Sequence, residues 1–360
     1  MDDDDIRTVS KPTVNDIARV AGVSLATVDR VLNTRPGVRR VTIDRVNSAI
    51  AQLGYVRDTA AANLARRRLY RLLFLLPSNR NEFVIALEQA IAEQGAKLIH
   101  QRTTLERRSV PPFDSRAICD TLDDLDPEEV DGVAVFGPET PSVRDAVKRA
   151  RAKGIAVVAL VSDLPSSDRD HFVGIDNVAA GRTAAQLMGR FVREAGRILV
   201  ITGSRLARDH LERRNGFDAV IGADYPNLDV VASIEGRDDP ELIQELLPDV
   251  FEAYPDICGI YSSAAGNPGL IRFIEETSRE KDLVVIAHEL TPGSRLALGS
   301  GVFDAIISQD TGHIVRSATR LLKATADQVP FDCTHELIRI DIHLRENMPL
   351  SPIPHAEELP

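Results

Sequence analysis

The sequence is poor in the features that mark membrane, secreted and disulfide-bonded proteins. It has no tryptophan and only three cysteines, Cys119, Cys258 and Cys333, whose odd number and wide spacing fit neither a disulfide framework nor a zinc site. No apolar run approaches the roughly 20 residues that span a membrane. The first residues, MDDDDIRTVSK, are acidic where a secretory signal is basic and then apolar. We therefore expect a chain that works in the reducing cytoplasm without a membrane partner.

Sequence patterns of common enzymes are also absent. There is no G-x-S-x-G elbow, no phosphate-binding loop ending in G-K-S/T and no H-E-x-x-H motif, and the eight histidines are scattered. His100, His171 and His313 stand at expected strand or helix ends, where a structural role is commoner than a catalytic one. We predict no catalytic residue, no metal and no cofactor. An enzyme acting on small polar metabolites stays open as an alternative.

Charge is distributed unevenly along the chain. The whole sequence carries a net charge of -11, yet residues 6–68 contain twelve Lys or Arg against four Asp. A basic N-terminal stretch before an acidic remainder is typical of a small DNA-binding unit attached to a body that stays off DNA. Chance clustering of surface charge is the alternative. With 360 residues, the chain has room for two or three domains.

Residues 13–32, TVNDIARVAGVSLATVDRVL, predict two short helices joined by a glycine-containing turn. Thr13 can cap the first helix, with Asp16 three residues on as the acid of a capping box. Gly22 can end that helix, and Ser24 can cap the second. Two helices joined so closely form a helix-turn-helix, whose second helix can enter the major groove of DNA. A helical hairpin within an ordinary core is the alternative.

The run VNDIARVAGVSLATVDRVLN resembles the headpiece of the LacI/GalR family of bacterial transcription regulators, in which a short helix and AGVS precede a recognition helix. The resemblance implies an all-α helix-turn-helix headpiece followed by a two-lobed α/β core with parallel sheets, as in periplasmic sugar-binding proteins. It also implies a homodimer that binds a palindromic double-stranded DNA operator. The implied domains are a headpiece at 1–57, a hinge at 58–69, an effector-binding and dimerisation core at 70–345 and a Pro-rich tail at 346–360. The tail has no leucine heptads, so a coiled-coil tetramer is not expected.

The DNA-reading surface implied by this resemblance combines the second helix with the hinge. The first turn of that helix carries Leu25 and Ala26, which can contact only thymine methyl groups. Arg30 matches the family arginine and can bond guanine O6 and N7. Asp29 departs from the family serine: it either pairs with Arg30 or Arg35, which we favour, or accepts from a cytosine amine. The residues predicted to contact DNA are Thr13, Ser24, Leu25, Ala26, Thr27, Asp29, Arg30, Asn33 and Leu64.

Two further elements connect the hairpin to the core. Thr42 can cap a third helix that runs to about Leu53, with apolar residues on one face. Residues 58–68, DTAAANLARRR, match the family's hinge helix, and Leu64 matches its minor-groove leucine. Small alanines would let two hinge helices pack closely while the leucine wedges between base steps. A plain polar linker with one buried leucine is the alternative.

From Tyr70 onward, short apolar runs alternate with amphipathic helices, which predicts parallel sheets with covered faces. In the first half, the expected helices cover 83–93, ending at Gly95, 142–153 and 178–194. The expected strands are 71–76, 96–101, 130–137, 154–161, 171–177, 196–203, 228–234, 258–262, 282–287 and 303–310. The chain is expected to change from one half to the other near 195–197.

Ligands of open α/β sheets lie at the carboxyl ends of the strands, and two lobes would here face one another across such a site. Resemblance to ribose-binding proteins and to the regulator core implies a sugar or polyol effector, held by an aromatic ring and by charged groups. Arg213, by its spacing to a following Gly-Phe pair, matches the arginine that usually contacts ligand, while Glu289 and Ser263 replace the commoner Asp and Asn. The implied effector residues are Phe83, Ser162, Asp176, Arg213, Ser263, His288, Glu289 and Gln309. Simpler roles stay open: Phe83 as core, Asp176 as a helix cap and Arg213 as a loop tie.

Together these features predict a DNA-binding transcriptional regulator, in the first interpretation a repressor whose operator affinity is set by the effector. Closing the cleft would separate the two hinges, so that Leu64 no longer wedges into DNA. An effector that strengthens operator binding is the alternative within this class. A solute-binding protein for transport and an enzyme are alternatives of other classes. The effector, the operator sequence and the regulated genes are open.

Overall fold

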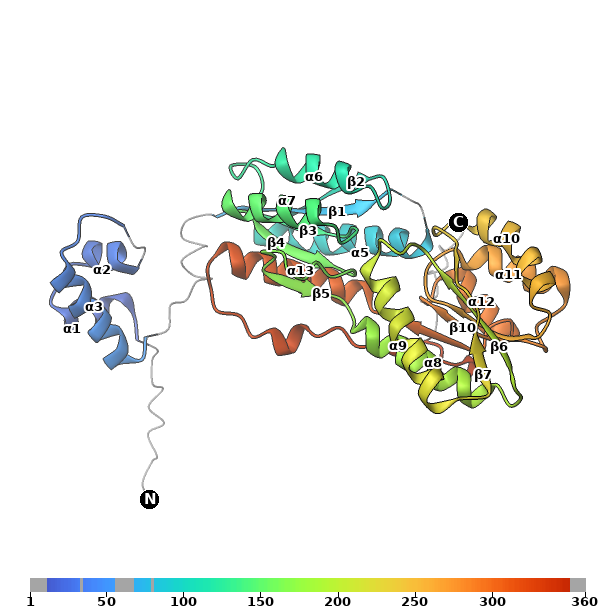
Figure 1. The fold of residues 1–360 in the computed structure, drawn as a ribbon. Coiled ribbons are helices and arrows are strands. Elements are labelled where there is room, and N and C mark those ends of the chain that lie inside the picture. Colours follow the sequence, from blue (N-terminus) through green and yellow to red (C-terminus); the bar gives the residue numbers. More distant parts are fainter. Residues whose placement is uncertain (1–11, 33–34, 56–67, 79–80, 350–360) are drawn as a thin grey trace, which may run out of the picture. The chain divides into compact units, whose positions relative to one another are not determined.

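The computed structural model describes residues 12–32, 35–55, 68–78 and 81–349 (Figure 1). Internal contacts divide the chain into a small unit, Met1–Arg68, and a large unit, Leu69–Pro360. Among the described residues, no helix is both long and apolar enough to cross a membrane. The small unit is helical where it is described, and the large unit is α/β.

The small unit contains α1 (Val14–Ala21), α2 (Leu25–Leu32) and α3 (Arg40–Leu53). The expected capping box is present at the start of α1: the Thr13 amide donates to the Asp16 carboxylate at 3.0 Å, and the Thr13 hydroxyl accepts from the Asp16 amide. These bonds lower the pKa of Asp16. Gly22 ends α1 in the left-handed conformation, as predicted. At the start of α2, the Ser24 hydroxyl accepts from the Thr27 amide at 3.2 Å, so the predicted cap is also confirmed.

All three helices contribute to the core of the small unit. The buried apolar residues are Ile17, Ala18, Ala21, Val28, Val46 and Ala49. The third helix begins earlier than predicted, because the amides of Thr42 and Ile43 already bond the Arg39 carbonyl. Arg39 therefore occupies the cap position, without a side-chain hydrogen bond, and the expected cap at Thr42 is wrong.

The large unit has two lobes, each built around one sheet (Figure 1). Its strands are β1 (Tyr70–Pro77), β2 (Thr103–Val110), β3 (Gly132–Val135), β4 (Ala156–Leu160), β5 (His171–Val173), β6 (Gly196–Thr202), β7 (Leu228–Val230), β8 (Ile234–Glu235), β9 (Ile257–Ser262), β10 (Val284–His288), β11 (Ala305–Ser308) and β12 (Asp341–His343). The first sheet is parallel throughout, in the order β2-β1-β3-β4-β5. The second has the order β12-β11-β10-β9-β6-β7, with β8 paired to β6 and the edge strand β12 antiparallel. The parallel α/β sheets predicted from the alternating pattern are thus confirmed.

Helices cover both sheets. They are α5 (Glu82–Leu98), α6 (Ser115–Asp123), α7 (Pro141–Ala152), α8 (Asn177–Phe191), α9 (Arg208–Asp224), α10 (Pro240–Ala253), α11 (Asn267–Thr277), α12 (Pro292–Ser300) and α13 (Thr311–Ala326). Short 3-10 turns are η1 (Ile99–Gln101), η2 (Cys333–Glu336) and η3 (Arg345–Asn347). Because helices lie on the sheet faces, central strands such as β4 are buried along their whole length and read as continuous apolar runs.

Two helices cross between the lobes. α8 packs against α9 and the second sheet, whereas α13 packs against α5 and the first sheet, beside β3, β4 and β5 (Figure 1). On α13, the Lys323 ammonium donates to the Thr103 hydroxyl at 3.1 Å, and the Tyr70 hydroxyl donates to Asp327 just beyond it at 2.6 Å. The sequence predicted that the chain passes once from the first half to the second, near 195–197. The chain instead returns to the first lobe through α13, so this prediction is incomplete. Sequence periodicity does not report this exchange, because an amphipathic helix covers either sheet equally well.

The strand expected at 96–101 is wrong. α5 continues past Gly95 to Leu98 and passes directly into η1. Ile91 and Leu98 are both buried and lie seven residues apart, which is the spacing of one helix face. The strand that does pair with β1 is β2, at 103–110, whose sequence TTLERRSV is mostly exposed. An exposed edge strand needs no apolar run, so the sequence pattern did not reveal it.

Candidate functional site

The small unit presents one face of α2 to solvent. Leu25, Ala26, Asp29 and Arg30 are exposed, and Leu25 is 51% exposed although it is apolar. Val28, on the opposite face of the same helix, is fully buried in the core. The outward face therefore offers one cation, one carboxylate and two apolar side chains at the start and middle of the helix.

Asp29 forms an ion pair inside the small unit. Its carboxylate accepts from the Arg35 guanidinium at 3.3 Å, and both side chains are more than half exposed. An exposed pair of this kind contributes little to stability, so its main effect is on where the carboxylate points. The favoured interpretation of Asp29, an ion pair with a neighbouring arginine, agrees with this geometry. Asn33 and Leu64, two other predicted DNA contacts, lie outside the described residues.

In the large unit, a hollow of about 420 Å³ opens where the two lobes face each other. The first lobe lines it with Asn81 and Phe83, at the start of α5. The second lobe lines it with loops that follow its strands, which carry Asp238, Asn267 and Glu289. The hollow thus lies at carboxyl ends of strands, where ligands bind in open α/β sheets.

The two lobes also touch directly beside this hollow. The Arg208 guanidinium of α9 donates to Glu139, which follows β3, at 3.0 Å. The Gly293 amide at the start of α12 donates to Glu82 of α5 at 3.4 Å. Both contacts join a residue of one lobe to a residue of the other.

Arg213 is the buried cation of the site, with 3% of its surface exposed. Its Nε donates to the Asn177 amide oxygen at 2.8 Å, and its Nη1 donates to the Ser263 carbonyl at 2.9 Å. Close packing of α8 on α9 sets this position. A Cβ on Gly181 would collide with the Arg213 carbonyl, and one on Gly216 would collide with the α8 backbone. The two glycines therefore allow α9 to bring Arg213 up to the hollow.

Glu289 and Gln309 form the acidic side of the site. The Gln309 amide donates to the Glu289 carboxylate at 2.9 Å. Burial raises the pKa of Glu289 to about 7, against the charge of Arg213, which favours the ionised form. Glu289 has a φ of 69°, a left-handed conformation that costs energy for a residue with a Cβ. The fold therefore keeps the Glu289 carboxyl group away from water and keeps the Glu289 backbone in an unfavourable conformation.

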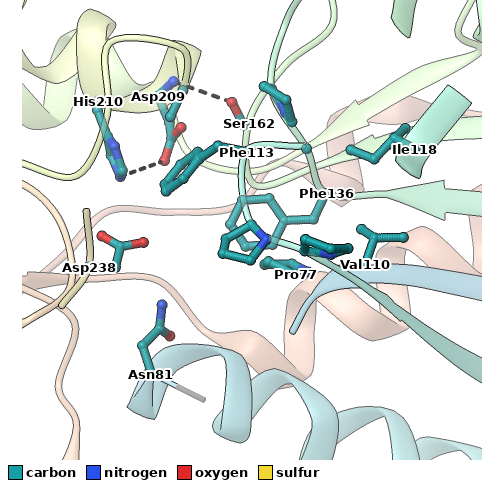
Figure 2. A pocket seen from close by; sticks show the side chains of 15 residues that line it. Pro77, Asn81, Val110, Phe113, Ile118, Phe136, Ser162, Asp209, His210 and Asp238 are labelled. Carbon is teal, nitrogen blue, oxygen red and sulfur yellow. Dashed lines mark hydrogen bonds and ion pairs between the residues drawn. The ribbon is translucent and has the colours of Figure 1, made fainter. Parts of the chain in front are cut away.

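Three functional candidates were missed by sequence reasoning. Figure 2 shows Asp209, His210 and Asp238 of the second lobe grouped on one side of a hollow, with Asn81 of the first lobe facing them. The His210 Nε2 lies 3.6 Å from the Asp209 carboxylate, and burial raises the pKa of Asp238 against the opposing charge of His210. Asp209 and His210 begin the helix that follows β6, so the strand-end rule could have found them. Asp238 lies in the turn GRDDP and is brought in only by the tertiary fold.

Unpartnered buried polar atoms gather in this cluster. Among the described residues, Asp209 Oδ1, His288 Nδ1 and Gln309 Oε1 are buried without a hydrogen-bond partner. His288 is otherwise held by the Tyr261 hydroxyl at 2.8 Å, and burial keeps its pKa well below the usual range. A buried polar atom left unpaired costs about 1–3 kcal/mol. Hydroxyl groups of a ligand are partners for such atoms, because a hydroxyl both donates and accepts.

Two of the predicted effector residues do not present their side chains to the hollow. Asp176 is exposed and caps α8, accepting from the Ala179 amide at 2.9 Å, and it lines a separate depression beside His171. The simpler role of a helix cap therefore replaces the predicted ligand contact. The Ser263 hydroxyl donates to the Ile201 carbonyl at 2.9 Å, so only the backbone of Ser263 serves the site, through Arg213.

The remaining predicted residues are brought together. Phe83, Arg213, Glu289 and Gln309 line one inner recess of the hollow. His288 lines its outer part. The Ser162 hydroxyl accepts from the Asp209 amide at 3.4 Å and borders the hollow of Figure 2.

Comparisons with protein families match both units. Residues 72–328 match the model described as periplasmic binding protein domain, and residues 13–58 match that of bacterial regulatory proteins of the lacI family. A relative is the HTH-type transcriptional regulator GntR of Pseudomonas aeruginosa, 27% identical over 72% of this chain and 73% of that protein. The ribose import binding protein RbsB of Escherichia coli is 21% identical over 72% of this chain and 86% of that protein.

Solved structures show the same fold for the large unit. A solute-binding protein of an ABC transporter from Burkholderia graminis, solved with D-arabinose, has a TM-score of 0.71 and 24% identity, covering 77% of this chain and 96% of that one. GanP, a glucose-galactose binding protein from Geobacillus stearothermophilus, has a TM-score of 0.71 and 21% identity, covering 79% of this chain and 100% of that one.

Proposed function

Because the chain belongs to the periplasmic binding protein domain family and carries a headpiece of the lacI family of bacterial regulatory proteins, we propose that this transcriptional regulator is a repressor controlled by a small sugar or polyol. The effector binds between the two lobes and sets the affinity of the headpiece for a palindromic operator. The protein acts as a homodimer, with one headpiece on each half-site.

The cluster of charged groups at the interlobe hollow carries this proposal. Arg213, Asp209 and Glu289 combine one cation with two carboxyl groups, and hydroxyl groups of a ligand can satisfy both kinds. Phe83 and Phe136 meet edge to face, with ring centroids 6.5 Å apart, and offer an apolar wall to the C–H face of a sugar. Two solute-binding proteins of the same fold, one solved with D-arabinose and one described as a glucose-galactose binding protein, support a sugar-like ligand.

The interlobe contacts supply a way for the ligand to act at a distance. Arg208 to Glu139 and Gly293 to Glu82 form while the lobes are close. A ligand that binds both lobes favours that arrangement by its difference in affinity for the two states. The first strand of the first lobe, β1, begins at Tyr70, directly after the proposed hinge at 58–69, so a shift of that lobe is passed to the end of the hinge. Leu64 is then withdrawn from the minor groove.

Contacts to DNA are assigned to the exposed face of α2 and its start. Arg30 reads guanine, and Leu25 and Ala26 contact thymine methyl groups. Thr13, Ser24, Thr27 and Asn33 bond phosphates or support the turn. Asp29 is held by Arg35 and so kept away from the phosphates. The resulting surface has few conventional base contacts, so Arg30 and the hinge carry much of the specificity.

The test joins operator selection to a ligand screen. The full chain selects its sites from random double-stranded DNA, and a thermal-shift screen of sugars and polyols identifies a ligand through a raised melting temperature. We expect that ligand to weaken operator binding about 5- to 150-fold, measured by fluorescence anisotropy. Arg213→Lys should reduce this effect, whereas Arg149→Lys, in a surface ion pair with Asp123, should leave it intact.

The outcomes separate the alternatives. Tighter operator binding in the presence of ligand would make the effector a co-repressor. Failure to enrich any DNA site would remove the regulator function and leave a solute-binding function for the core. Turnover of a ligand, lost in Glu289→Ala, would support an enzyme instead.

A further inference from the structure

The first lobe contributes an apolar surface to the hollow of Figure 2, which adjoins the larger interlobe hollow and shares Asn81, Pro112 and Asp238 with it. Pro77 and Val110 are the last residues of β1 and β2, and Phe136 directly follows β3. Ile118 from α6 lies behind them, and Phe113 lies between them and the second lobe (Figure 2). None of these five side chains can make a hydrogen bond. We call these five residues the apolar subsite.

The local fold holds the apolar subsite open and in shape. Phe113 has a φ of 59°, an uncommon conformation for an aromatic residue, and follows two prolines that stiffen the loop after β2. Asp114 anchors the end of that loop by accepting from the Arg116 and Ala117 amides at 2.9 and 3.0 Å. Gly137 completes the floor, because a Cβ there would collide with the Ile118 side chain.

The same hollow is polar on its other side. Ser162, Asp209, His210 and Asp238 border it, and the space inside it is about 40 Å³, room for a small group only (Figure 2). Asp209 is 3% exposed and keeps one carboxylate oxygen without a partner among the described residues. A ligand that reaches this oxygen therefore also meets side chains to which a hydroxyl cannot bond.

We propose that the effector is a sugar or polyol that carries an apolar end, either a deoxy carbon or an alkyl or aryl substituent. Its hydroxyl groups face Asp209 and Asp238, and its apolar end lies against Val110, Ile118 and Phe136. This inference rests on the proposed function, because it names the class of ligand for the same cleft. A hydroxyl turned toward the apolar subsite would lose its bonds to water and gain none. Each methylene buried there should strengthen binding about fourfold.

The first experiment compares matched pairs of ligands by isothermal titration calorimetry on the full chain. The pairs are 6-deoxyhexoses against their parent hexoses, and methyl or phenyl glycosides against free sugars. We expect the member with the apolar group to bind at least about tenfold more tightly, with a more negative heat-capacity change. Equal or tighter binding by the hydroxylated parents would overturn the inference and leave the proposed function standing.

Two variants test whether the apolar subsite causes the preference for the ligand with the apolar group. Val110→Thr keeps the side-chain shape and adds a hydroxyl beside the ligand, so it should reduce the preference for the apolar member severalfold. Val147→Thr makes the same change at a buried site in α7 that does not line the hollow, and should leave the ratio unchanged. An unchanged ratio in Val110→Thr would contradict the assignment.

A second probe is independent of any sugar. Xenon binds dry apolar space, so titration of methyl-labelled protein should shift the Ile118 and Val110 signals selectively. Absence of these shifts overturns the inference. If xenon shifts them but no sugar in the pairs binds, the proposed sugar effector fails while the apolar subsite is supported. The two failures are thus distinguishable.

Discussion

The Arg213 guanidinium donates to the Asn177 side-chain oxygen at 2.8 Å, which ties α9 to the first residue of α8. Both residues are buried, and Asn177 in turn donates to the Val161 carbonyl of the first lobe at 3.4 Å. Arg213 is therefore positioned at the junction of the two lobes, where a ligand would meet both. The ligand contact proposed for Arg213 would thus share one charged residue of α9 with the contact between the lobes.

Arg213→Lys should weaken effector binding about 10- to 100-fold. Lysine keeps the charge but cannot hold Asn177 and Ser263 with a planar fork, so the charge is displaced from the hollow. Calorimetric titration of the ligand found by screening measures the loss. Arg149→Lys is the matched control, because Arg149 makes a comparable fork to Asp123 on the surface. Equal losses in both variants would argue against a ligand role for Arg213.

Glu289→Gln should change how stability depends on pH. Burial raises the pKa of Glu289 to about 7 from its ordinary value of 4.5, so the folded state binds more protons than the unfolded state between these values. Its contribution to stability is thus present at low pH and falls as pH rises toward 7. At pH 8, Glu289→Gln should be more stable than the original chain by up to about 3 kcal/mol relative to the difference at pH 4.5. Urea unfolding at both pH values measures this. A parallel pH dependence in both proteins would contradict it.

Gly216→Ala should destabilise the large unit and weaken effector binding without removing any polar group. An alanine Cβ would collide with the Val178 carbonyl and push α8 away from α9. The expected cost is about 1–3 kcal/mol, as for overpacking. Gly222→Ala, in the same helix, meets nothing within 4 Å and should stabilise by about 0.5–1 kcal/mol. Thermal melts and ligand titrations of both variants give the comparison.

Asp29→Ser should preserve or tighten operator binding. The substitution removes a carboxylate from the exposed face of α2 and releases Arg35 for phosphate contact. Asp44→Ser removes the same charge from α3 and is the control for net charge alone. Anisotropy titrations on the selected operator and on random DNA, at two salt concentrations, measure both. A large loss on the operator alone would instead show that Asp29 reads a base.

Glu139→Gln should make closure of the lobes less favourable. Glu139 is mostly buried and accepts from Arg208 across the lobe boundary. Weakening that bond should lower effector affinity a few fold, although Glu139 lies outside the predicted effector set. Small-angle scattering with and without effector reports the change in compactness. Glu128→Gln, an exposed residue in the turn before β3, is the control.

Much of the headpiece was predictable because its determinants are local. The capping box of Thr13 and Asp16, the left-handed Gly22 and the Ser24 cap all depend on residues within four positions of each other. Thr42 shows the limit of such reasoning. A threonine before an apolar pattern suggests a cap, but the helix had already begun at Arg40, with Arg39 as its cap.

The cleft was only half predictable. Arg213 and Glu289 could be named because each stands beside a short recognisable string, and Phe83 because it follows the first strand. Asp238 could not, since nothing local links its turn to α9, and Asp176 was misassigned because a strand end also suits a helix cap. Whether a side chain is buried, and which other side chains it meets, depends on segments that are distant from it in the sequence.

Local sequence patterns were enough to predict the helix-turn-helix, the alternation of strands and helices, and the basic N-terminal stretch before an acidic remainder. These follow from periodicity, capping and composition, which act over a few residues. Three features became visible only in the folded chain: α13 returns to the first lobe, Asp209 and Asp238 share a recess with Glu289, and Val110, Ile118 and Phe136 line a hollow together with Asp209 and Asp238. The physical reason is that burial and pairing depend on which sheet each helix covers, and an amphipathic pattern does not specify its partner.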